Sequence, residues 1–162
     1  MFREMRRKNQ VLSSEECIQV LNRATSGVLA VSGDDDYPYA VPLSYIYHNN
    51  KIYFHGAKTG HKLDGIMRNE KVSFCVIDQD EIVQEEYTSY FRSVIAFGKA
   101  RIMEGEEKKR ALEILTARYS PDIEEMERSK AVDKGLMGVC MIELEIEHMS
   151  GKEAVALKKA KQ

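Results

Sequence analysis

Strand-like segments separated by turn residues occupy most of this chain, and their order restricts the possible folds more than any other feature. β-branched and aromatic residues are concentrated in six stretches, with Gly, Asp, Asn or Pro between them. Helical periodicity is confined to a few insertions, so the parallel βαβ repetition of α/β folds is absent. The pattern predicts a mainly β fold, an antiparallel β-barrel with helices. The six stretches are residues 27–32, 37–47, 51–56, 72–77, 90–103 and 139–147.

The helices have local signals in the sequence. Ser13 and Glu16 have the spacing of a capping box, and the apolar stripe that follows predicts a helix to about Arg23. Periodicity predicts that this helix is followed by others later in the chain. These are expected at residues 63–69, 106–119 and, unless it is a mobile charged segment, 122–134.

Two segments have the composition of irregular structure. Residues 78–89 are acidic and predict a connecting loop with some strand character. The lysine-rich tail from about residue 157 is expected to be frayed. No repeat, low-complexity stretch or linker divides the chain, so residues 1–162 are expected to form a single domain.

The composition excludes several classes of function. The net charge is −2, whereas nucleic-acid-binding domains usually carry a marked basic excess, so no nucleic-acid partner is expected. No apolar stretch approaches the length of a membrane span, and the basic N-terminus lacks the apolar run of a signal peptide. We therefore expect a cytoplasmic protein with no membrane contact. Three cysteines without CxxC spacing indicate reduced, buried thiols and no metal site.

The segment from Lys51 to Lys62 is the strongest candidate binding site in the sequence. A strand enters a short, basic loop with two glycines, and this loop opens the helix expected at residues 63–69. The first turn of a helix has unpaired N–H groups and a positive dipole end, and both attract anions. Lys58 and His61 add donors to this loop. The segment predicts a site for a phosphate-bearing ligand; solvated basic residues at a helix terminus are the alternative interpretation.

Five short motifs occur in register along the chain and indicate its relatives. They are Tyr-Pro-Tyr-Ala-Val-Pro-Leu-Ser-Tyr, Ile-Tyr-Phe-His-Gly-Ala, Gly-His-Lys, Phe-Arg-Ser-Val and Glu-His-Met-Ser-Gly-Lys-Glu, at residues 37–45, 52–57, 60–62, 91–94 and 147–153. With these motifs the chain resembles the pyridoxamine-5′-phosphate-oxidase-like split-barrel flavoproteins, and within them the Nim nitroimidazole-resistance proteins. The resemblance extends from Met1 to about Ala154.

The resemblance implies a six-stranded antiparallel split barrel of the FMN-binding type. Such proteins are homodimers that bind FMN, occasionally another flavin such as FAD, in clefts at the dimer interface. It implies flavin contacts from the second strand, from the end of the third strand and from the loop that follows, which holds the phosphate. A later strand approaches the cofactor, often from the other subunit. Carried onto this chain, the contacts are Val41, Pro42, Leu43 and Ser44; His55, Gly56 and Ala57; His61 and Lys62; and Arg92 and Ser93.

Several of these residues also have a purely structural interpretation. His55, at the end of an apolar strand, is either a catalytic residue beside the flavin or a structural histidine with one or two partners. Arg92 lies among apolar residues, so it either pairs with a carboxylate or reaches the flavin across a dimer interface. Val41 and Leu43 are equally suited to core packing, whereas Pro42 must lie where no backbone donor is required.

Two functions follow from this reasoning. The first is an FMN-dependent oxidoreductase that passes electrons to a small, electron-poor acceptor, with 5-nitroimidazoles as the example that the resemblance names and His55 as the candidate proton donor. The alternative is a flavin- or haem-binding protein without turnover, acting as a sensor, store or scavenger. Relatives that oxidise pyridoxamine phosphate carry a C-terminal motif with tryptophan and arginine. This chain has no tryptophan and no arginine after Arg128, so that activity is not expected.

Overall fold

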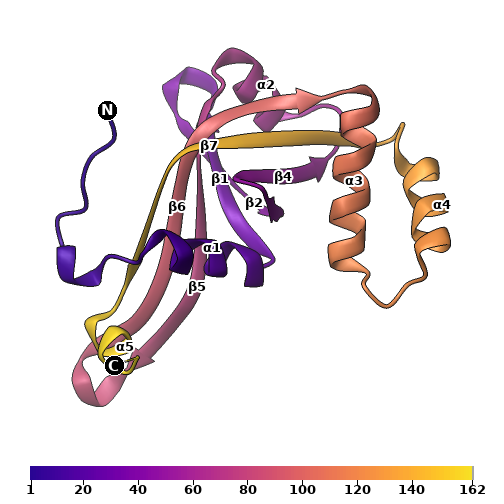
Figure 1. Cartoon of the computed structure of the whole chain (residues 1–162). Helices are drawn as coiled ribbons and strands as arrows, with labels where there is room; N and C mark the ends of the chain where they lie inside the picture. The colour runs from indigo at the N-terminus through magenta and orange to yellow at the C-terminus, as the bar shows by residue number, and fades with distance from the viewer. Residues whose placement is uncertain (162) are drawn as a thin grey trace.

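The computed structural model describes residues 1–161, and its strands form one antiparallel sheet (Figure 1). In the described residues the strand order is β2-β1-β5-β6-β7-β4-β3, and every pairing is antiparallel. The strands are β1 (Ser26–Ser32), β2 (Pro38–Ser44), β3 (Ile46–His48), β4 (Lys51–Gly56), β5 (Lys71–Val83), β6 (Thr88–Met103) and β7 (Cys140–Glu153). The helices are α1 (Ser14–Arg23), α2 (His61–Arg68), α3 (Gly105–Tyr119), α4 (Glu125–Gly135) and α5 (Val155–Lys159).

The predicted fold class is confirmed as a mainly β, antiparallel split barrel with helices, although there are seven strands in place of six. The additional strand arises because Tyr45 interrupts the run that was expected at residues 37–47. The buried Tyr45 hydroxyl donates to the carbonyl of Leu21 (2.8 Å). The Tyr119 hydroxyl accepts from the Tyr45 N–H (3.1 Å) and donates to the Tyr45 carbonyl (2.8 Å). These bonds replace strand pairing at this residue and leave β2 and β3 as separate strands.

The main core lies between the inner face of the sheet and helices α1 and α2. Phe74 on β5 makes edge-to-face contacts with Tyr45 and Phe54, each with ring centroids 4.9 Å apart. Helix α1 packs its apolar side, including Val20 and Leu21, against this core. The expected capping box is present, because the Ser13 hydroxyl accepts from the Glu16 N–H and the Glu16 carboxylate accepts from the Ser13 N–H. The helix therefore begins and ends as predicted.

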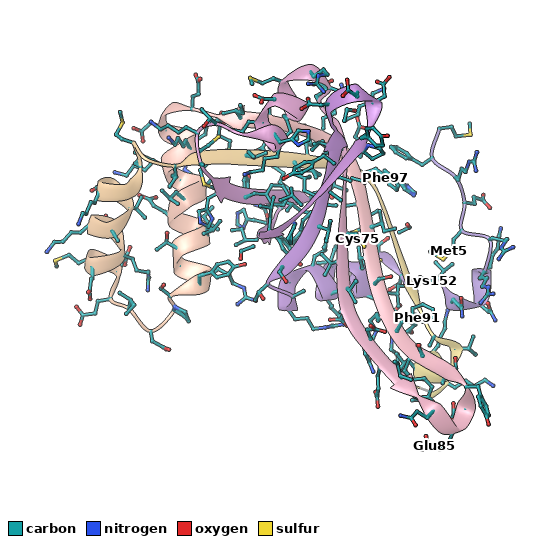
Figure 2. The ribbon with its side chains drawn as sticks, turned by 180° about the vertical axis from the view of Figure 1, so that it is seen from behind. Met5, Cys75, Glu85, Phe91, Phe97 and Lys152 are labelled. Carbon is teal, nitrogen blue, oxygen red and sulfur yellow. The ribbon has the colours of Figure 1, made fainter. Side chains whose placement is uncertain are left out.

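The segment 78–89, expected to be a connecting loop with some strand character, is the distal part of a long hairpin. β5 continues to Val83, a short 3-10 turn covers Gln84–Glu86, and β6 begins at Thr88. The hairpin extends well beyond the rest of the sheet, with Glu85 at its tip (Figures 1 and 2). A bulge between Ile77 and Gln79 shifts the register where the hairpin leaves the barrel. Local composition did not reveal these strands, because the residues that stabilise them are distant in sequence.

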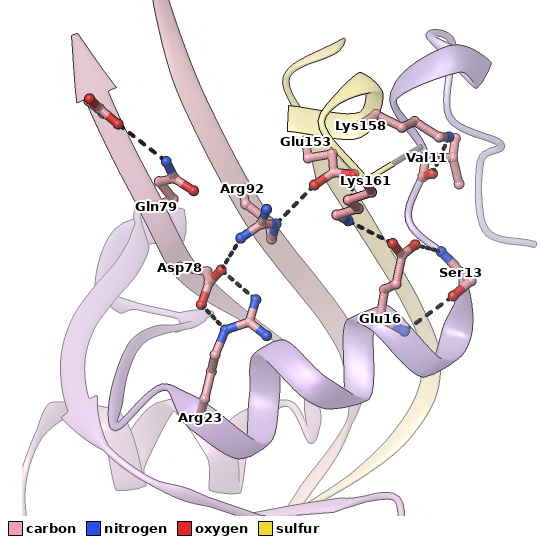
Figure 3. Close-up of polar contacts among 11 residues, drawn as sticks. Val11, Ser13, Glu16, Arg23, Asp78, Gln79, Arg92, Glu153, Lys158 and Lys161 are labelled. Carbon is pink, nitrogen blue, oxygen red and sulfur yellow. Dashed lines mark hydrogen bonds and ion pairs between the residues drawn. The ribbon is translucent and has the colours of Figure 1, made fainter. Parts of the chain in front are cut away.

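A chain of ion pairs supports the hairpin (Figure 3). Asp78 lies 2.6 Å from Arg23 of α1 and 3.0 Å from Arg92 of β6. Arg92 also donates from Nε to Glu153 of β7 (2.9 Å), whose side chain is fully buried. Burial by itself raises the pKa of the Asp78 carboxyl, but the hydrogen bonds from Arg23 and Arg92 outweigh this and hold that pKa below its ordinary value. The two arginines thus join α1, β5, β6 and β7.

The lysine-rich tail, expected to be frayed, contains a short helix and contacts with distant residues. It forms α5, and Lys158 donates to the carbonyl of Val11 (2.9 Å). Lys161 contacts Glu16 (2.7 Å) and Glu153 (2.8 Å). These partners lie far from the tail in sequence, so local composition gave no sign of them. Helices α3 and α4 form a separate hairpin at the other end of the molecule, and no helix in residues 1–161 is long and apolar enough to cross a bilayer.

Candidate functional site

The turn from β4 into α2 has the geometry of an anion site. Phe54 is fully buried in the barrel, and the alternation of the strand places His55 on the exposed side. Gly60 is the N-cap of α2 with φ at +135°, a conformation that favours glycine. No side chain caps this end of the helix, and Gly60 O accepts from the N–H groups of Leu63 and Asp64. The earlier N–H groups of the first turn therefore remain for a ligand.

Lys62 lies over the backbone of Gly56. A Cβ atom at Gly56 would be 3.0 Å from the Lys62 ammonium and 3.1 Å from its Cε. Within residues 1–161, Lys62 forms no ion pair with a carboxylate, in contrast to Lys51 at the start of β4, which lies 3.0 Å from Glu143. A half-buried ammonium without a counter-ion, beside an uncapped helix terminus, is an arrangement that a phosphate completes.

His61 is held toward β2 rather than toward Lys62. Its ring stacks on Tyr39 with centroids 4.0 Å apart, and its Nε2 accepts from the N–H of Asp34 (3.3 Å). Arg68, at the C-terminal end of α2, donates to the Asp34 carboxylate (2.9 Å). This hydrogen bond, with a smaller contribution from His61, holds the pKa of the Asp34 carboxyl below its ordinary value. Because Nε2 is occupied, a phosphate contact from His61 would use Nδ1 or the backbone N–H.

The four predicted residues of β2 divide between the two faces of the strand. Val41 and Leu43 pack against the main core, whereas Pro42 and Ser44 are exposed on the opposite face. β2 is the terminal strand of the sheet order and pairs with β1 alone among the described strands. Pro42 therefore lies on an edge strand, where its missing N–H costs no ladder bond. The free edge and the exposed face of β2 are the parts open to a ligand.

Arg92 and Ser93 also point to opposite faces, and a single chain does not bring them to the α2 turn. Arg92 faces α1 and is held by Asp78 and Glu153, so the carboxylate pairing considered from sequence is present. Ser93 pairs with Ile77 in register and shares its face of the sheet. Both residues lie on the distal part of β6, and their role as flavin contacts stays a prediction that requires a second subunit.

The face of the sheet that carries Ser93 is apolar and exposed, and we call it the outer face. Val28, Cys75 and Ile95 lie opposite one another on β1, β5 and β6. Ile77 and Phe97 follow on the same face at the next alternate positions, and Cys75 and Phe97 are labelled in Figure 2. Val28, Ile95 and Phe97 are 36–38% exposed and Ile77 is 66% exposed. Solvent-facing sheet surfaces are usually polar, so this surface has the character of an interface.

The outer face also carries a cavity of about 770 Å³. It lies under the N-terminal segment, where Phe2 stacks on His148 (centroids 4.7 Å apart) and packs near Phe97 (5.5 Å). Pro38 at the start of β2 and Ser73 on β5 contribute to its wall. The cavity therefore borders the exposed side of β2 on which Pro42 and Ser44 lie.

Residues 13–153 match the pyridoxamine 5′-phosphate oxidase family, which is most of the chain. The chain belongs to this family. The family membership expected from the five motifs is thereby confirmed. Among curated proteins, an uncharacterized protein of Rhizobium meliloti is 31% identical over 90 residues, which are 56% of this chain and 54% of that protein. The chain thus spans about half the length of the curated relative that it matches.

Solved structures of family-like proteins share this fold. A candidate 5-nitroimidazole antibiotic resistance protein of Bacteroides thetaiotaomicron superposes with a TM-score of 0.73 and 22% identity, covering 88% of this chain and 86% of that one. An FAD-binding protein of Mesorhizobium loti superposes with a TM-score of 0.59 and 27% identity, covering 89% and 95%. At 22% identity, the likeness to the Bacteroides protein shows that the two chains share a fold.

The structure thus brings together some predicted residues and adds others. Gly56, Ala57, His61 and Lys62 lie in one turn, and Tyr39 links that turn to β2. His55 is exposed at the end of β4, and its imidazole ring has no hydrogen-bond partner among residues 1–161. Sequence reasoning missed the contribution of Asp34, which contacts His61 from the loop after β1, and of Arg68 on α2, which holds Asp34. The only sequence signal for Asp34 was an acidic turn, which is common at surfaces.

Proposed function

We propose that this family member binds a flavin nucleotide and acts as an oxidoreductase toward a small, electron-poor acceptor. The observation that carries the proposal is the β4–α2 turn, where the Lys62 ammonium lies over Gly56 without a carboxylate partner in the described residues. The group that fits is a phosphate monoester or diphosphate, because cation, glycine backbone and uncapped helix all favour an anion. Two observations support a flavin nucleotide as the ligand that carries this phosphate. One structural neighbour is an FAD-binding protein, and the family that the sequence resembles binds FMN.

In this proposal each part of the chain has a distinct task. Lys62 and the first N–H groups of α2 hold the phosphate, and His61, fixed by Tyr39 and Asp34, defines the side of the turn toward β2. The edge and outer side of β2 at Pro42 and Ser44 contact the ring system. When bound, the flavin supplies the electron-transfer chemistry, and the protein supplies orientation and exclusion of water.

We further propose that the protein is a homodimer through the outer face. Apolar side chains on this face are exposed in one chain, and the register makes the outward positions of β2 continuous with them, since Pro42 lies opposite Val28. A second copy on this face covers Ile95 and Phe97 and forms the second wall of the cleft beside β2. It also brings the partner's Ser93 face toward that cleft.

The primary experiment is an absorption spectrum of the purified protein, followed by mass analysis of the material that heat releases. We expect a flavin spectrum, and Lys62→Ala should weaken flavin binding by about 1.5–3 kcal/mol, the loss of a charge-assisted hydrogen bond. The matched control is Lys134→Ala in α4, which removes the same charge far from the turn. A colourless protein that does not take up FMN or FAD at micromolar concentration would contradict the proposal.

Flavin binding without turnover is the second candidate, and the freedom of His55 favours it. A proton donor in catalysis needs a fixed position, whereas the His55 side chain is exposed and its ring has no hydrogen-bond partner among residues 1–161. Anaerobic reduction of the flavoprotein followed by mixing with a 5-nitroimidazole separates the two functions. Faster reoxidation than buffer-mixed controls supports the reductase, and His55→Gln should then slow it. An unchanged reoxidation rate supports binding alone, and a haem absorption band would identify a haem protein.

A further inference from the structure

A small cavity lined by two lysines lies next to the β4–α2 turn. It has a volume of about 300 Å³ and is formed by the loop after β4, the end of β6, the start of α3 and the start of β7. Lys58 and Lys108 line it from two of these elements, and Ile102 and Val139 supply apolar wall. The volume is at the lower end of about 300–1,000 Å³, the range of small-molecule sites.

Lys62 connects this cavity to the proposed phosphate site. Cys140, in the cavity wall, pairs in register with Gly56, over which Lys62 lies. Lys108 and Cys140 line the same cavity, and the charges of Lys108 and Lys62 oppose the rise in the pKa of the Cys140 thiol that burial causes. Three lysines from the β4–α2 turn and α3 therefore surround one short stretch of β7.

These lysines are not neutralised by the chain itself. Within residues 1–161, Lys58, Lys62 and Lys108 form no ion pair, whereas the neighbouring Lys109 pairs with Asp133 (2.9 Å). The one carboxylate that lines the cavity is the exposed Glu104. Gathering like charges costs free energy. A ligand with two adjacent negative groups would offset this repulsion. One group would lie at Lys62, and the other would lie between Lys58 and Lys108.

We propose that this cavity, which we call the Lys58–Lys108 subsite, holds the adenylyl phosphate and nucleoside of FAD. This inference rests on the proposed function and deepens it, because FMN has one phosphate and would leave the subsite empty. In FAD the two phosphates share a bridging oxygen, so neighbouring cation groups suit a diphosphate. The first phosphate occupies the Lys62 turn, and the second lies toward Lys108. The adenine then contacts the apolar wall at Ile102 and Val139.

The test measures the affinities of flavin-free protein for FMN, FAD and riboflavin by quenching of flavin fluorescence. We expect the wild-type protein to bind FAD at least about tenfold more tightly than FMN, the effect of about one charge-assisted contact. Lys108→Gln should bring the ratio of the two affinities close to 1. Lys58→Gln, a change in an exposed loop that does not endanger folding, should reduce the same ratio. Arg110→Gln removes equal charge two residues away on the exposed surface of α3 and should leave the ratio unchanged.

The outcomes separate this inference from the function on which it rests. Equal affinity for FMN and FAD in the wild-type protein would overturn the subsite while the flavin site stands. A loss of FMN and FAD affinity by the same factor in both lysine variants would also overturn it, since the lysines would then act on the shared phosphate. If riboflavin binds as tightly as FMN, or if no flavin binds, the phosphate site and the subsite fall together.

Discussion

Single residues decide the chemistry of the β4–α2 turn, and Gly56 is the clearest case. Its lack of a side chain allows the Lys62 ammonium to lie over the backbone. A glycine at this position was predicted to contact the flavin through the family resemblance, and the structure supplies the physical reason for its type. His61 shows the limit of local reasoning, because its orientation depends on Asp34, which is 27 residues earlier in the chain.

Gly56→Ala should weaken flavin binding without destabilising the fold. The new Cβ would lie 3.0 Å from the Lys62 ammonium, so the flexible lysine must shift by a few tenths of an ångström. We expect about a tenfold loss of flavin affinity, or about 1.4 kcal/mol. The free energy of unfolding should stay the same or rise by up to about 1 kcal/mol, because alanine restricts the unfolded chain. Gly138→Ala is the control, since its Cβ would have only an ordinary contact at 3.5 Å. Undiminished flavin affinity would show that the position of Lys62 does not matter.

At the scale of elements, the long hairpin depends on ion pairs that local sequence does not reveal. The helix α1 was predictable because its capping box joins residues three apart. The distal strands of β5 and β6 were not, because Arg92 and Glu153 are 61 residues apart and Arg23 and Asp78 are 55 apart. The contacts of the tail follow the same rule, with Lys161 and Glu16 145 residues apart. The turn at Lys62 was predictable because all its parts are adjacent in the chain.

Asp78→Asn should destabilise the protein by about 3 kcal/mol at pH 7, the low end for buried ion pairs, because Arg23 is half exposed. The pKa of Asp78 in the folded protein is lowered from an ordinary 3.8. Its contribution to stability is therefore complete above about pH 4 and is lost as the pH falls through the lower, folded-state pKa. Urea unfolding of both proteins at several pH values should show a difference that shrinks only in this acidic range.

The matched control for this experiment is Asp80→Asn. Asp80 is exposed on the same strand and forms no ion pair within residues 1–161, so its replacement should change the unfolding free energy by less than about 0.5 kcal/mol. If Asp78→Asn were no more destabilising than this control, the ion pairs would not stabilise the hairpin. A difference between the two variants that did not shrink at all as the pH fell below about 4 would assign the effect to packing rather than to charge.

For the whole molecule, the proposed dimer predicts that a substitution which separates the two subunits also weakens flavin binding. Ile95→Asp places a charge at the centre of the outer face, opposite Cys75, without entering the barrel core. We expect light scattering to report a monomer, and flavin affinity to fall by at least about tenfold because the cleft loses one wall. Ile123→Asp, at a comparably exposed isoleucine between α3 and α4, should remain a dimer with normal flavin content. A monomeric wild-type holoprotein would contradict the proposed assembly.

The outer face also affects the solubility of the folded chain before two copies associate. Strands β1, β5 and β6 present apolar side chains on both sides, one toward the barrel and one toward solvent. If the proposed dimer forms, a newly made chain that has folded but has not yet paired exposes this surface and is therefore prone to aggregate. Supplying riboflavin during expression should then raise the yield of recoverable protein, since a ligand that binds only the assembled state draws the chains toward it by mass action.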